Sequence, residues 1–95
     1  MTRYRTRPGV VLTEICGAYM LVSAKANLTL CPYVTEINGT SAFLWKRLVK
    51  GADELELLEA VKESYEIGEP EAALEAIRGF ITSMLEMNYL LADEE

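Results

Sequence analysis

The sequence predicts an α+β domain in which a three-stranded antiparallel sheet is followed by three α-helices. In the first 37 residues, apolar side chains either alternate with polar ones or run together with many β-branched residues, as strands require. From residue 39 onward they recur at i, i+3, i+4 and i+7, the period of a helix with one buried face. A chain of 95 residues forms one domain with a thin core.

The three strands are expected over residues 9–15, 18–24 and 33–37. The first alternates and ends at a Cys16-Gly17 turn, whereas the second is almost entirely apolar, which favours a central position. Residues 28–32, LTLCP, either extend this hairpin or connect it to the third strand. Because Pro32 cannot donate a ladder hydrogen bond, the third strand is expected to begin after it or to lie at an edge.

The first two helices carry clear start signals. Asn38 is a good N-cap for a helix over about 39–49, and Gly51 is expected to end that helix in a left-handed conformation. Asp53, with Glu56 three residues later, predicts a capping box at the start of the second helix. The apolar stripe expected on the second helix is Leu55, Leu58, Val61 and Tyr65, with Leu57 beside it.

The third helix is expected to begin at Glu69-Pro70, because proline in a first turn loses no hydrogen bond, and to reach Met87 or Asn88. Its main stripe is Leu74, Ile77, Ile81 and Leu85. A second apolar line lies next to it: Ala73, Ala76, Phe80, Met84 and Met87. That second line either completes the core, forms a dimer contact or binds a ligand.

Charge divides the chain into two halves. Residues 1–50 carry seven basic and two acidic side chains, whereas residues 51–95 carry two basic and thirteen acidic ones, for a net charge of −6. Residues 1–8 are expected to form a flexible basic arm and residues 92–95 an acidic tail, with a single domain over 9–91 between them. A duplex-DNA reader normally surrounds its recognition helix with Lys and Arg, so the acidic helical half argues against nucleic acid as a partner.

The sequence also argues against a membrane location and a metal site. No apolar run approaches the roughly 18 residues that span a bilayer, and no signal-peptide segment follows the N-terminal arginines, so we expect a cytoplasmic protein. Cys16 and Cys31 are separated by fourteen residues in a chain without histidine, which argues against a zinc ligand set. The two cysteines are expected to be small apolar fillers in strands.

No catalytic constellation is present in the sequence. There is no histidine, no GxSxG, no P-loop and no GxGxxG. Carboxylate pairs such as Glu59 and Glu63 are four residues apart on an exposed helix face, where nothing suggests the burial that an acid–base pair needs. We therefore expect no enzymatic activity and no cofactor. A small domain with surplus apolar surface is typical of a binding module, and an edge strand over 33–37 beside the helix 70–88 could receive an extended peptide.

Three stretches of the chain resemble the PqqD-like family: RPGVVLTEI, the segment YVTEINGTSAFLWKRLVKGADELELLEAVKESYEI, and ALEAIRGFITSMLEMNYL. The most specific pieces are the run from Asn38 through Thr40 to Trp45 and the Gly51 that follows it. The likeness covers roughly residues 7–91. Members of this family are recognition domains of pathways that modify ribosomally made peptides. The resemblance implies a winged-helix-like fold and non-catalytic binding of a precursor's leader segment, which is presented to a modifying enzyme, often a radical SAM protein.

The resemblance also implies where the leader binds. It adds a strand to the third strand, which assigns backbone pairing to Tyr33, Val34, Thr35 and Glu36. The groove against the third helix would be lined by Ile77, Phe80, Ile81 and Met84, and Arg78 would pair with an acidic leader side chain. Two other functions stay open: a winged-helix DNA-binding regulator, and a dimeric protein-interaction adaptor, since family members also form homodimers.

Overall fold

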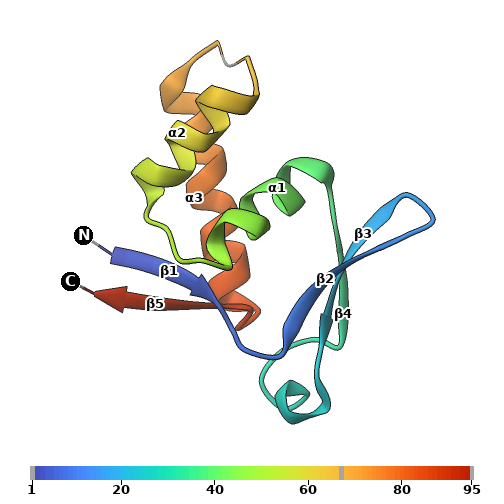
Figure 1. Ribbon diagram of the computed structural model, residues 1–95. Coiled ribbons are helices and arrows are strands. Elements are labelled where there is room, and N and C mark those ends of the chain that lie inside the picture. The colour runs from blue at the N-terminus through green and yellow to red at the C-terminus, as the bar shows by residue number, and fades with distance from the viewer. Residues whose placement is uncertain (1, 67, 95) are drawn as a thin grey trace.

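The computed structural model describes residues 2–66 and 68–94 (Figure 1). Its helices are α1 (Gly39–Leu48), α2 (Glu54–Ser64) and α3 (Pro70–Glu86). Its strands are β1 (Thr2–Thr6), β2 (Val10–Ile15), β3 (Ala18–Ser23), β4 (Val34–Ile37) and β5 (Leu90–Glu94), with a short 3₁₀ turn at Lys25–Asn27. The predicted fold class is confirmed, because the antiparallel sheet β2-β3-β4 precedes three helices in a winged-helix-like arrangement.

The sheet β2-β3-β4 places the apolar strand β3 at its centre, as its sequence predicts. One face of the sheet contacts the core through Leu21, which is fully buried, and Val10. The other face is open, and Val11 on it is 55% exposed. Residues 28–32 form turns rather than a strand, so β4 begins after Pro32 and lies at an edge of the sheet.

The caps predicted for the first two helices are present. The N–H of Ser41 donates to Asn38 Oδ1 at 2.8 Å at the start of α1. At the start of α2, the N–H of Glu56 donates to Asp53 Oδ1 at 2.8 Å, and the N–H of Asp53 donates to Glu56 Oε1 at 3.0 Å. Gly51 has a φ of +85°, the left-handed conformation expected after α1.

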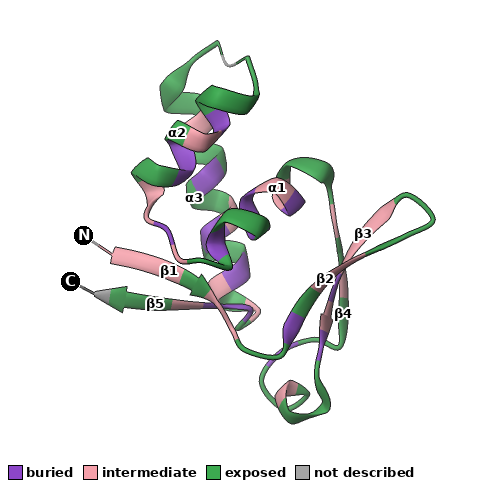
Figure 2. Cartoon of the chain, in the orientation of Figure 1, coloured by how far each residue is buried: buried purple, intermediate pink, exposed green. Residues whose placement is uncertain are grey.

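The core lies where the three helices face one another and the sheet (Figure 2). Trp45 of α1 is its largest buried side chain, and its ring meets that of Tyr89 edge-on. The stripe expected on α2 is partly wrong, because Leu55 is 52% exposed and Leu57 is fully buried. Packing against α3 turns α2 so that Leu57, rather than Leu55, faces the core beside Leu58 and Val61.

The two ends of the chain differ from the expected arm and tail. Residues Thr2–Thr6 and Leu90–Glu94 pair as an antiparallel ribbon, β1–β5, on the side of the molecule away from the β2–β3 hairpin (Figure 1). Opposite charges favour this pairing, since Arg5 Nε lies 2.9 Å from Asp93 Oδ2. Reciprocal backbone hydrogen bonds between Tyr4 and Ala52, at 2.8 and 2.9 Å, connect the ribbon to the segment between α1 and α2. Met1 and Glu95 lie outside the described residues.

The expectation that both cysteines are small apolar fillers in strands is wrong, because neither lies in a strand. Cys31 is buried, but in the loop before β4, where its sulfur lies 3.2 Å from Ser23 Oγ. Cys16 is exposed in the β2–β3 turn, because the hairpin extends beyond the core. Across residues 2–66 and 68–94, no helix combines the length and apolarity needed to cross a membrane.

Candidate functional site at the open edge of β4

The outer edge of β4 is the first feature of the site. β4 pairs with β3 on one side only, and no other strand in the described part of the chain pairs with its second side. An edge of this kind presents backbone N–H and C=O groups that another extended chain can complete. The edge is short, because β4 spans Val34–Ile37.

The hydrogen-bond pattern determines which residues of β4 face outward. The N–H of Ser23 donates to the C=O of Tyr33 at 2.9 Å, so this opposed pair is hydrogen-bonded. Hydrogen-bonded and non-hydrogen-bonded pairs alternate along an antiparallel ladder. Thr35 therefore directs its N–H and C=O toward β3, opposite Leu21, whereas Val34 and Glu36 direct theirs to the open edge.

A network of hydroxyl groups holds the start of β4 against the end of α3. Tyr89, three residues beyond α3, is fully buried, and its hydroxyl lies 2.6 Å from Thr35 Oγ1. The same hydroxyl donates to the C=O of Pro32 at 3.0 Å. Ser23 Oγ also donates to the Pro32 carbonyl, at 2.6 Å. The position of the β4 edge is thus tied to β3 and to the end of α3.

A cleft of about 420 Å³ lies beside this network and continues the site past the beginning of β4. One wall is formed by the loop before β4, residues 28–32, and the other by Glu86 and Met87. Asn88 joins the two walls, because its side-chain amide donates to the C=O of Leu30 at 2.6 Å. The cleft is lined by polar and apolar groups in similar measure, including the Glu86 carboxylate.

The strand residues of the predicted site occupy three different environments. Tyr33 precedes β4 and is 62% exposed. The side chain of Thr35 is half-buried toward the helices, while Val34 and Glu36 are exposed on the open face of the sheet. These four residues follow one another along one edge, but only Val34 and Glu36 direct backbone groups outward, whereas those of Tyr33 and Thr35 face β3.

The predicted helix residues do not all lie at the surface. Ile77, Ile81 and Met84 are only 2 to 4% exposed and belong to the core. Phe80 is half-buried and packs against that core from the side. Arg78 is exposed, and its Nε lies 3.0 Å from Glu54 Oε1 on α2. The structure therefore places Arg78 beside α2.

Two residues that sequence reasoning left out of the site belong to its geometry. Met87 lines the cleft, and it is the last member of the second apolar line noted in the sequence. Tyr89 positions Thr35, but the two are 54 residues apart, and nothing in the sequence pairs them. The second apolar line is thus divided, with Met84 in the core and Phe80 and Met87 half-exposed.

Comparisons with known proteins show a likeness of fold. No protein-family model matches the chain, and no curated protein matches its sequence. A solved structure of lasso peptide synthetase B1 complexed with the leader peptide is similar, with a TM-score of 0.72 and 22% identity, over 93% of this chain and 96% of that one. TbiB1 in complex with the TbiA(beta) leader peptide is similar, with a TM-score of 0.72 and 15% identity, over 90% and 93%.

Proposed function

We propose that this chain binds the leader segment of a ribosomally made precursor peptide as an added strand on β4. The observation that carries the proposal is the outward-facing backbone of Val34 and Glu36 on a strand with one free edge. A peptide in extended conformation completes such an edge with main-chain hydrogen bonds, which fix its register. The two similar structures, which are leader-peptide complexes, support this assignment.

Side chains of the bound leader supply selectivity. Alternate residues of an added strand point to opposite faces of the sheet. Those on the inner face approach the half-exposed line of Phe80 and Met87 and the cleft formed with residues 28–32. Leaders with apolar residues at alternate positions are therefore preferred. Ile77, Ile81 and Met84 support that surface from beneath.

The domain acts by binding and delivery, without chemistry of its own. Its partner is a peptide-modifying enzyme, and the PqqD-like resemblance favours a radical SAM protein. The similar structures of lasso peptide synthetase B1 proteins make a lasso precursor leader a further probe. Arg78, whose Nε is engaged by Glu54, remains a predicted contact for an acidic leader side chain.

A nuclear magnetic resonance titration tests the proposal. The probe is the leader of this chain's cognate precursor peptide, added to the ¹⁵N-labelled protein. We expect amide shifts in residues 33–37 and in the half of α3 that contains Phe80, together with slower amide exchange at Val34 and Glu36. Amide shifts confined to α2, or no amide shifts with a large excess of peptide, would refute the assignment.

A further inference from the structure

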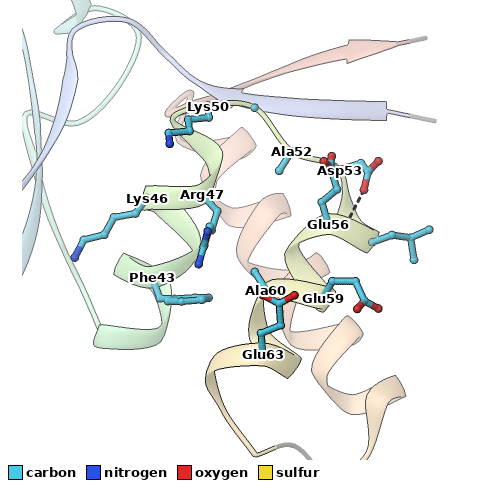
Figure 3. Close-up of a pocket in the computed structure, with 12 residues that line it drawn as sticks. Phe43, Lys46, Arg47, Lys50, Ala52, Asp53, Glu56, Glu59, Ala60 and Glu63 are labelled. Carbon is cyan, nitrogen blue, oxygen red and sulfur yellow. Dashed lines mark hydrogen bonds between the residues drawn. The ribbon is translucent and has the colours of Figure 1, made fainter.

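A second and larger cleft lies between α1 and α2, away from the β4 edge (Figure 3). Its volume is about 710 Å³. Ala52, just before α2, and Ala60 on α2 are both among its lining residues, and their small side chains leave room for another chain to approach. None of its lining residues belongs to β4 or α3, so a leader on β4 leaves this cleft free.

The two walls of the cleft carry opposite charges at the same helical spacing. The α1 wall is basic and is formed by Phe43, Lys46, Arg47 and Lys50. The α2 wall is acidic and is formed by Glu56, Glu59, Ala60 and Glu63. Each set follows i, i+3, i+4 and i+7. The acidic set is one face of α2, whereas the basic set is a face of α1 together with Lys50, which lies two residues past the end of that helix. Figure 3 shows Arg47 and Glu63 turned into the space between the helices, and Lys46 and Glu59 extending outward from its rims.

The charges of the two walls do not neutralise each other. Among the described residues, neither Lys46 nor Lys50 has a carboxylate within 4.0 Å, and the Arg47 guanidinium lies over the Phe43 ring, 5.3 Å from its centre. Glu63 on the facing wall likewise has no ion pair. On the acidic wall, Glu56 pairs with Arg3 and Glu59 with Lys62, so Glu63 is its unpaired carboxylate. The unpaired Lys46, Arg47 and Lys50 on one wall and Glu63 on the other suit an occupant with complementary charge on both sides.

We infer that this cleft docks a helix of the peptide-modifying enzyme. That helix has an acidic edge toward α1, a basic edge toward α2, and small apolar residues along its centre, over Ala52 and Ala60. The inference rests on the proposed function, since it assigns the enzyme a surface separate from the leader edge. The leader and the modifying enzyme therefore bind the domain at the same time. The domain holds the enzyme close to the precursor peptide whose leader lies on β4.

Charge reversal within the cleft, matched by the same reversal elsewhere, tests the inference. Arg47→Glu changes the α1 wall, and Lys25→Glu makes the same charge change at an exposed lysine outside the cleft. Glu63→Lys and Glu75→Lys form the corresponding pair for the α2 wall. Urea unfolding confirms that each variant folds. Isothermal titration then measures affinity for the cognate modifying enzyme and, separately, for the leader.

The two cleft variants are expected to lose roughly tenfold or more in enzyme affinity, while both controls stay within about threefold, because charges at an interface centre act more strongly than remote ones. Leader affinity stays unchanged in all four. Equal enzyme affinity in cleft and control variants would overturn the inference, as would leader-induced amide shifts at Arg47 and Glu63. Failure of the wild type to bind leader would instead count against the proposed function, because enzyme binding is measured without the leader.

Discussion

Removing the hydroxyl of Tyr89 is expected to destabilise the fold and loosen the β4 edge. The Tyr89→Phe substitution keeps the ring, and with it the edge-on contact to Trp45. It deletes two hydrogen bonds, one shared with Thr35 Oγ1 at 2.6 Å and one donated to the Pro32 carbonyl at 3.0 Å. The ring is fully buried, so water does not replace the lost group.

The loss of stability in Tyr89→Phe depends on whether Thr35 and Pro32 keep other hydrogen bonds or contact with water. A neutral hydrogen bond contributes about 0.5 to 1.5 kcal/mol to stability. The Pro32 carbonyl keeps the bond from Ser23 Oγ, and Thr35 Oγ1 is only half-buried, so neither partner carries the full penalty of burial without a hydrogen bond. We therefore expect Tyr89→Phe to lower the free energy of unfolding by about 1 to 2 kcal/mol.

Urea unfolding measures this loss directly. For a domain of this size, a slope near 1 kcal/mol per molar urea converts it to a midpoint shift of about 1 to 2 M. Tyr65→Phe is the matched control, because Tyr65 is 45% exposed and its ring, which meets Phe43 edge-on, is kept. Amide exchange at Thr35 should quicken only in Tyr89→Phe. Equal midpoints for the two variants would refute the role given to the Tyr89 hydroxyl.

Three further substitutions test the caps and the exposed arginine. Gly51→Ala should cost about 1 to 2 kcal/mol in urea unfolding, because Gly51 has a φ of +85°; no loss would mean that this turn relaxes freely. Asp53→Ala removes the capping bond to the Glu56 amide and should cost about 1 kcal/mol, with fraying of the first turn of α2 seen in amide exchange. Arg78→Glu breaks an exposed pair with Glu54 and should cost less than about 1 kcal/mol, while weakening an acidic leader more strongly. Equal losses in folding and binding would make Arg78 structural.

Features governed by neighbouring residues were predictable from the sequence. The Asn38 cap, the Asp53–Glu56 capping box and the left-handed Gly51 depend on contacts within a few positions, and all three are present. The order of strands and helices follows from the change in apolar period near residue 39. These signals were sufficient for the fold class.

Features that depend on distant residues were not predictable. The β1–β5 ribbon joins the two ends of the chain, whereas the sequence of residues 1–8 predicted only a flexible basic arm. The burial of Leu57 in place of Leu55 depends on how α2 meets α3. In the site, the pairing of Arg78 with Glu54 and of Tyr89 with Thr35 likewise arises only when the helices and sheet are assembled.

Leader affinity of two variants at Glu36 tests the central claim most directly. The Glu36 N–H faces the open edge, so Glu36→Pro removes a donor for an added strand while sparing the ladder to β3. Glu36→Ala removes the same side chain and keeps the N–H. By isothermal titration, Glu36→Pro should lose leader binding about tenfold or more relative to Glu36→Ala, with both variants folded, because it also blocks close approach of the peptide backbone. Equal affinities would contradict strand addition on β4.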